Sequence, residues 1–222
     1  MGNGPNISLT FGGANPRLAH KGLVLVHGRG GSAADIMGLG RALALPNLAF
    51  VAPEAPNNTW WPTSFLAPMG QMTPFVDHGI AAVIATISAL ESQGLSRDRI
   101  AIAGFSQGGC LALEYGARMG DGMAGIFGLS AGLIGTEDTS DGPDDALYGF
   151  APKQFDYTAR LTGMPVAITV HDQDPHIPLK RAQDSAAVFE KLGANVMFDI
   201  TAGAGHAITQ AGITALRAAL NC

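Results

Sequence analysis

The chain has 222 residues, of which 47% are hydrophobic and 14% are charged, and its formal net charge at neutral pH is −5. This composition suits one well-packed globular domain, and we expect a single domain over residues 1–222. No run of Lys or Arg builds a basic face, which argues against nucleic acid or an anionic membrane as the main partner.

The two cysteines, Cys110 and Cys222, indicate where the protein works. Cys110 falls in an apolar predicted helix and Cys222 is the last residue, so we expect no structural disulfide and a reducing compartment. The first residues lack a signal-peptide pattern, and Asn6 stands where a myristoylation signal needs Ser or Thr. No apolar run approaches the roughly 18 to 20 residues that span a bilayer. The sequence predicts a cytoplasmic protein with no membrane span.

Short apolar runs alternate with helical patterns along the whole chain. The inner runs are continuously apolar, as is typical of a parallel sheet with helices on both faces. This alternation predicts an α/β fold with a mostly parallel, doubly wound sheet. The predicted strands are 6–11, 22–27, 48–53, 99–104, 125–130, 165–171 and 195–200. The predicted helices are 32–45, 75–93, the stretch after Ser106, 179–193 and the tail from Ala207.

Two long segments, 53–74 and 133–161, are predicted to be irregular. Long loops in a compact domain tend to be functional or mobile. The second segment contains an acidic run at 137–145, which we interpret as a solvated loop. The first is rich in large apolar side chains, and because ligand sites are mostly apolar we interpret this group as the lining of an acyl pocket, although core packing accounts for some of its members. The group comprises Trp60, Trp61, Phe65, Met69, Met72 and Phe75.

The pattern G-x-S-x-G occurs twice, around Ser106 in "GFSQG" and around Ser130 in "GLSAG". In a chain with 30 glycines the pattern alone is weak. A nucleophile elbow also needs a strand before the serine and a helix directly after it. A helical stretch follows Ser106, whereas the glycine-rich, acidic stretch after Ser130 has no helical period. We therefore predict that Ser106 is a nucleophile and that Ser130 only ends a core strand.

A serine nucleophile needs a base and a group that orients the base. In α/β-hydrolases the chain order is serine, acid, histidine, and His206 is the histidine that follows both the serine and a strand-end carboxylate. The alternative is that His206 only caps the last helix. Asp172 and Asp174 compete as the acid, and Asp174 is favoured because the following proline restricts its backbone. We expect no metal at "HDQDPH", which lacks calcium-loop spacing and a cysteine ligand.

An oxyanion hole needs N–H groups that point at the developing charge. The N–H of Gln107 lies at the N-terminus of the predicted helix, where the helix dipole favours negative charge. The turn "HGRGGS" offers a second N–H, and Arg29 is its best candidate. The same turn has neither the spacing nor the ending of a phosphate-binding loop.

Five segments together resemble the phospholipase/carboxylesterase family of small α/β-hydrolases, which includes acyl-protein thioesterases. They are "LVHGRGG", "APNNTWWPTSF", "IAIAGFSQGG", "DPHIPL" and "GAGHAI", in the family's order from about Lys21 onward. The resemblance implies a cofactor-independent serine esterase without a large cap domain. It assigns catalysis to Ser106, Asp174 and His206 and the oxyanion N–H groups to Arg29 and Gln107. One departure is Arg29, since the family often has Leu there.

The expected activity is two-step acyl transfer on small to medium acyl or aryl esters, with a small-molecule ester as the partner. The same site would also serve a lysophospholipase or an acyl-thioesterase, and these alternatives stay open. A catalytically silent binding protein is a further alternative, although such proteins usually lose a residue of the triad. The sequence does not decide whether the chain forms a homodimer.

Overall fold

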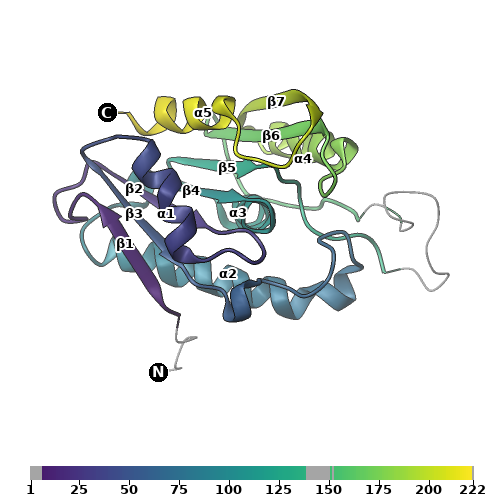
Figure 1. Cartoon of the computed structure of the whole chain (residues 1–222), viewed down its shortest axis with the longest axis horizontal. Coiled ribbons are helices and arrows are strands. Elements are labelled where there is room, and N and C mark those ends of the chain that lie inside the picture. Colours follow the sequence, from purple (N-terminus) through teal and green to yellow (C-terminus); the bar gives the residue numbers. More distant parts are fainter. Residues whose placement is uncertain (1–6, 139–150, 152, 222) are drawn as a thin grey trace.

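The computed structural model describes residues 7–138, 151 and 153–221. These residues form a seven-stranded sheet with the order β1-β3-β2-β4-β5-β6-β7 (Figure 1). β1 is antiparallel to β3, and every other neighbouring pair is parallel. This architecture confirms the predicted α/β fold with a mostly parallel sheet. The strands are β1 (Leu9–Gly13), β2 (Lys21–Val26), β3 (Leu48–Pro53), β4 (Ile100–Phe105), β5 (Gly125–Leu129), β6 (Pro165–Gln173) and β7 (Asn195–Ala204).

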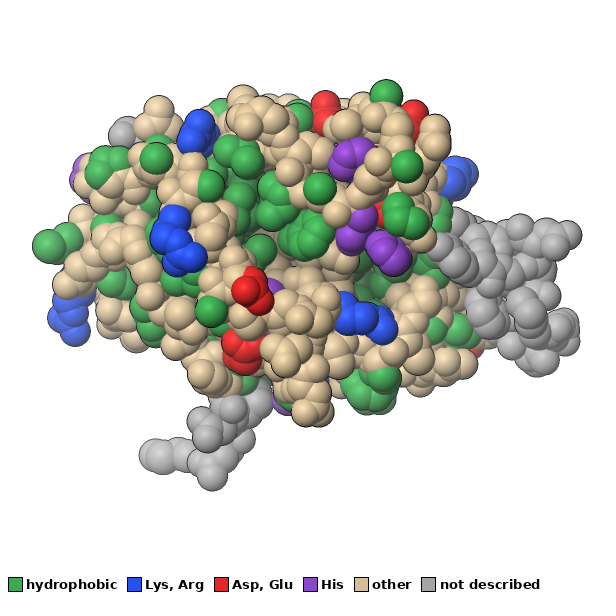
Figure 2. Space-filling model, in the orientation of Figure 1, with side chains coloured by type: hydrophobic (Ala, Val, Ile, Leu, Met, Phe, Trp, Pro, Cys, Tyr) green, Lys and Arg blue, Asp and Glu red, His purple; other side chains and the backbone are tan. Residues whose placement is uncertain are grey.

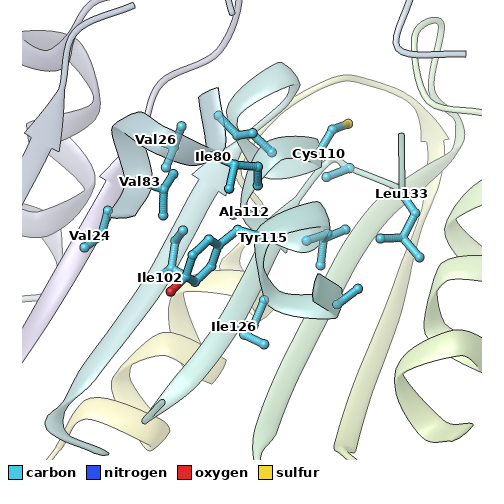
Figure 3. Close-up of a cluster of buried hydrophobic side chains, with 14 of the residues drawn as sticks. Val24, Val26, Ile80, Val83, Ile102, Cys110, Ala112, Tyr115, Ile126 and Leu133 are labelled. Carbon is cyan, nitrogen blue, oxygen red and sulfur yellow. The ribbon is translucent and has the colours of Figure 1, made fainter. Parts of the chain in front are cut away.

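Helices cover both faces of the sheet, which explains why the inner strands are apolar throughout. Within β2, Leu23 and Leu25 point into the core under α1 and α5, while Val24 and Val26 point into the core under α2, α3 and α4. Figure 3 shows Val24 and Val26 beside side chains of α2 and α3. The helices are α1 (Ala33–Ala42), α2 (Met69–Glu91), α3 (Gln107–Met119), α4 (Leu179–Lys191) and α5 (Gln210–Leu220).

Helix α2 begins at Met69, six residues before the predicted start at 75, and it contains Pro74. A proline inside a helix costs about 3 kcal/mol because it lacks an N–H and its ring is crowded. Met72 and Val76 on the same turns are fully buried, and burying such side chains contributes about 1.5–3 kcal/mol each. Packing on the sheet therefore offsets the proline. The irregular segment is correspondingly shorter and contains a 3-10 turn at Pro56–Asn58.

Helix α2 also has the length and composition of a membrane-crossing helix, with a mean hydropathy of 1.4 over its most apolar window. We did not expect such a segment from the sequence. In the fold, nine residues of the helix are buried, and the helix packs on β2, β3 and α3. We therefore interpret α2 as a core helix. On the face drawn in Figure 2, charged side chains are scattered and do not form one patch.

The carboxyl ends of β2 and β4 lie side by side in the middle of the sheet. From β2 the chain continues to β3 on one side, and β4 pairs with β2 on the other side. Such a reversal of strand order leaves a crevice above the strand ends where ligands bind. The turn after β2 and the junction after β4 therefore meet at the expected place for a site. The acidic run at 137–145 lies outside the described residues beyond Asp138.

Candidate active site

Ser106 occupies a strained junction between β4 and α3. Its backbone has φ 55° and ψ −123°, a conformation that costs a non-glycine residue about 1–3 kcal/mol. Glycines on either side let the strand and the helix approach each other. A Cβ on Gly104 would lie 2.1 Å from the carbonyl oxygen of Gly108, and one on Gly108 would lie 2.2 Å from that of Val26. The glycines of "GFSQG" are thus required by close backbone contacts.

The structure brings together the three side chains that the sequence predicts as a triad. His206 Nε2 lies 2.7 Å from Ser106 Oγ. On the other side of the ring, His206 Nδ1 lies 2.8 Å from Asp174 Oδ2 and 3.0 Å from Oδ1. When Nδ1 donates its proton to the carboxylate, Nε2 is free to accept the hydroxyl proton of Ser106. The arrangement suits proton transfer from a serine to an imidazole.

The surroundings of Asp174 and His206 limit their movement. The Asp174 side chain is fully buried, and its Oδ1 accepts hydrogen bonds from the main-chain N–H groups of His176 (2.8 Å) and Ile177 (3.0 Å). The His206 ring packs against Phe105 and His176, with ring centroids 5.1 Å and 4.8 Å away. Both partners of the imidazole–carboxylate pair are therefore held before any substrate binds.

Asp172 and Ser130, the alternatives to Asp174 and Ser106 in the sequence analysis, make other contacts. Asp172 Oδ1 accepts a hydrogen bond from the N–H of Gly203 at 2.7 Å, so this carboxylate joins the ends of β6 and β7. Ser130 directly follows β5 and donates its hydroxyl to the carbonyl oxygen of Ala207 at 3.0 Å. Neither side chain contacts the imidazole of His206 in a hydrogen bond that the described residues contain.

Arg29 and Gln107, which the sequence predicts as oxyanion donors, both lie beside Ser106. Gln107 is the first residue of α3, so its N–H has no partner within the helix. Arg29 follows Gly28, which is packed against Ser106: a Cβ on Gly28 would lie 3.3 Å from Ser106 Cβ. Both residues line the same cavity as Ser106. The assignment of their N–H groups to an oxyanion hole stays a prediction.

The side chain of Gln107 has a structural role that the sequence analysis missed. Its Oε1 accepts from the N–H of Trp60 (2.9 Å) and from the hydroxyl of Thr59 (3.2 Å), and its Nε2 donates to the carbonyl oxygen of Trp61 (2.8 Å). The Arg29 guanidinium also binds this loop through the carbonyl oxygens of Pro62 and Thr63. The two predicted oxyanion residues thus hold one wall of the site with their side chains.

His27 is a second residue whose role was missed, and it stabilises the turn that carries Arg29. The ring is buried; Nδ1 donates to the carbonyl oxygen of Gly28 (2.8 Å), and Nε2 accepts from the N–H of Ala55 (3.1 Å). This pair of bonds requires a neutral ring. The main-chain oxygen of His27 accepts from Trp60 Nε1 at 2.9 Å. The signal in the sequence was the polar residue His27 at the end of an apolar run.

A cavity of about 600 Å³ opens beside Ser106, within the size range of small-molecule sites. Trp61 and Phe65 line it as predicted, while Phe105, Cys110 and Ile177 were not anticipated. Four predicted lining residues do not belong to it, and one of them, Phe75, is exposed on α2. Trp60 is buried against His27, Met72 is a fully buried residue of α2, and the N–H of Met69 binds the carbonyl oxygen of Thr136. The early start of α2 explains the two methionines, because it turns them toward other parts of the fold.

Cys110 also lines the cavity and carries a thiol. Burial raises the pKa of its thiol to about 12, because a thiolate would be poorly solvated there. The thiol therefore stays protonated near neutral pH and is a poor nucleophile. The hydroxyl of Ser106, in contrast, lies 2.7 Å from the imidazole of His206.

Comparisons with known proteins show which family the chain resembles. A model of the family described as Phospholipase/Carboxylesterase matches residues 14–222. The crystal structure of a phospholipase/carboxylesterase from Dyadobacter fermentans is 34% identical, with a TM-score of 0.84 and coverage of 97% of this chain and 96% of that chain. A carboxylesterase from Bacillus cereus shares the fold at 15% identity, with a TM-score of 0.67 and coverage of 96% and 93%.

A curated relative has a more specific name. Acyl-protein thioesterase 1 of Gibberella zeae is 32% identical over 115 residues, which are 51% of this chain. The aligned part spans 43% of that relative's length. The family match over nearly the whole described chain confirms the resemblance predicted from the sequence motifs: the chain belongs to the phospholipase/carboxylesterase family of α/β-hydrolases.

Proposed function

We propose that the protein is a serine carboxylesterase that hydrolyses small to medium acyl or aryl esters. The observation that carries this proposal is the contact of one imidazole with both Ser106 Oγ (2.7 Å) and Asp174 Oδ2 (2.8 Å). A serine hydroxyl is a weak nucleophile near neutral pH, and an oriented imidazole makes it reactive. The cavity beside Ser106 supplies an apolar wall for an acyl or aryl group.

The reaction proceeds by two acyl transfers. Ser106 Oγ attacks the ester carbonyl carbon while His206 Nε2 takes the hydroxyl proton, and Asp174 stabilises the imidazolium. The tetrahedral intermediate collapses, the C–O bond of the ester breaks, and His206 returns the proton to the leaving alcohol. Water then attacks the acyl-enzyme, with His206 again as the base. The products are a carboxylic acid and free Ser106.

The negative charge of each tetrahedral intermediate is assigned to the N–H groups of Gln107 and Arg29. A donor that is already in place costs no reorganisation during the reaction, and loss of one such donor typically lowers the rate about 10²–10³-fold. Gln107 and Arg29 are preorganised here by their own side chains, which bind the loop at residues 59–63. No metal or cofactor takes part in this scheme.

A thioester is the second candidate substrate, because a curated relative is named an acyl-protein thioesterase. The same acyl-enzyme would form from a thioester or from a lysophospholipid. A panel of aryl esters, aliphatic esters, acyl-CoA and lysophosphatidylcholine separates these substrates by kcat/KM. We expect the highest kcat/KM values for the esters. The proposed working compartment is the cytoplasm.

The nucleophile is tested by Ser106→Ala with a short p-nitrophenyl ester. We expect turnover to fall to nearly the uncatalysed rate while the circular dichroism spectrum stays unchanged, since only one oxygen atom is removed. A fluorophosphonate probe should label the wild-type protein but not the variant, because it reacts only with an activated serine. Substantial turnover by Ser106→Ala would rule out the assignment. An unlabelled wild-type protein would favour a silent binding protein.

A further inference from the structure

Ser130 has a conformation that a glycine would adopt more easily. It directly follows β5, has φ 47° and is fully buried. The glycines around it have packing roles: a Cβ on Gly128 would lie 2.6 Å from Leu113 Cδ1, and one on Gly132 would lie 2.9 Å from Arg181 Cγ. Glycine would relieve the strain at position 130 itself. The side chain of Ser130 therefore needs a separate explanation.

The hydroxyl of Ser130 connects two parts of the site. Its Oγ donates to the carbonyl oxygen of Ala207 at 3.0 Å. Ala207 directly follows His206 in the loop between β7 and α5. On the other side, the carbonyl oxygen of Leu129, which precedes Ser130, accepts a hydrogen bond from the N–H of Ser106 at 2.9 Å. One short stretch of chain thus holds the backbone of the nucleophile and the backbone beside the base.

We propose that Ser130 is a positioning residue that keeps the His206 imidazole aligned with Ser106. The inference rests on the proposed esterase function of the same site. Proton transfer needs the two atoms at hydrogen-bond distance, and a shift of about 1 Å can cost about 10²-fold in rate. Because Ser130 is fully buried, water does not readily replace its hydroxyl. Loss of the hydroxyl would free the carbonyl oxygen of Ala207 and loosen the loop beside His206.

Two substitutions and a matched control test this role. Ser130→Gly removes the hydroxyl and suits the positive φ, whereas Ser130→Ala removes the hydroxyl and keeps the Cβ. Thr169→Val is the control. Thr169 lies on the neighbouring strand β6, where it pairs with Leu129 of β5, and it is fully buried. Its hydroxyl has no hydrogen-bond partner among the described residues. All three variants lose one buried hydroxyl close to the same strand end.

The measurements are kcat, KM, the rate of fluorophosphonate labelling and the melting temperature. We expect kcat and the labelling rate of Ser130→Gly and Ser130→Ala to fall about ten- to a hundredfold, with KM changed less than about twofold. Ser130→Gly should melt within a few degrees of the wild type, because it relieves the backbone strain. Thr169→Val should keep the wild-type rates.

The inference is overturned if Ser130→Gly and Ser130→Ala keep wild-type kcat, or if Thr169→Val loses as much. It is also overturned if kcat falls only in proportion to the folded fraction, which would show a purely structural role. Ser106→Ala is measured beside these variants. If the wild type has no Ser106-dependent turnover or labelling, the proposed function itself is refuted. If the wild type is active and the Ser130 variants have the same rates, only the proposed role of Ser130 is refuted.

Discussion

Two carboxylates that are separated by one residue have different roles at the end of β6. The pairing of β6 with β7 shifts register between His171 and Gln173, and Asp172 there binds the N–H of Gly203. Asp174 comes after the strand, where the following proline and the N–H groups of His176 and Ile177 hold its carboxylate toward His206. At the scale of single residues, an irregular strand end determines which acid meets the base.

A pair of substitutions separates the two acids. Asp174→Asn should lower kcat by about 10⁴-fold, because an amide nitrogen beside Nδ1 favours the wrong imidazole tautomer. Asp172→Asn should keep kcat within a few fold, because its amide oxygen still accepts from Gly203. Steady-state kinetics on one p-nitrophenyl ester measures both. Similar losses in the two variants would show that the acid is misassigned.

The junction of β4 and α3 is the element on which the geometry of the site depends. The strand and the helix meet with backbone atoms in contact, and the helix start also packs on the end of β2: a Cβ on Gly108 would lie 2.2 Å from the carbonyl oxygen of Val26 and 2.4 Å from that of His27. Backbone atoms cannot move aside as a flexible side chain can. The junction therefore tolerates no side chain at this position.

Two glycine-to-alanine changes test the junction. Gly108→Ala should destabilise the fold by about 3 kcal/mol or more, because the added methyl group overlaps backbone atoms of β2. Gly38→Ala is the control in α1, where the nearest atom to an added Cβ is Arg41 Nη2 at 3.9 Å. It should stabilise the protein by about 0.5–1 kcal/mol, since Ala favours helix more than Gly does. Urea unfolding measures both, and equal effects would contradict the contact argument.

In the molecule as a whole, Cys110 is a fully buried member of the main core, which combines side chains of the sheet and of the helices (Figure 3). Burial raises the pKa of its thiol from an ordinary value near 9.0 to about 12. A pKa that is raised in the folded state means that folding favours the protonated form. This contribution to stability is complete below about pH 9 and decreases as the pH rises toward 12.

The variant Cys222→Ser leaves Cys110 as the remaining cysteine, so that the burial and the raised pKa of its thiol can be measured. We expect its thiol to react with dithiobis(nitrobenzoate) at pH 8 only as fast as the protein unfolds, and the urea midpoint to decrease between pH 9 and pH 11. Reaction at the rate of a free thiol in the folded protein would show that Cys110 is accessible. A midpoint that is constant across this range would show that the thiol pKa is not raised.

Much of the fold could be predicted from the sequence, because the apolar runs of a doubly wound sheet and the glycines of its tight junctions are local signals. The prediction of Ser106, Asp174 and His206 as a triad rested on strand ends and chain order, and these three side chains are in contact in the structure. The start of α2 could not be predicted, since Pro74 is unfavourable locally and only burial of Met72 and Val76 offsets it.

The contacts within the site depended on tertiary structure for a similar reason. Nothing near Gln107 in the chain indicates that its amide binds residues 59–61, and nothing near Ser130 indicates a bond to Ala207. The local sequence determined which backbone conformations and which side chains were available at the strand ends. Which of these side chains meet was decided only by the packed sheet, because the partners are separated by tens of residues and approach each other only when the strands pair.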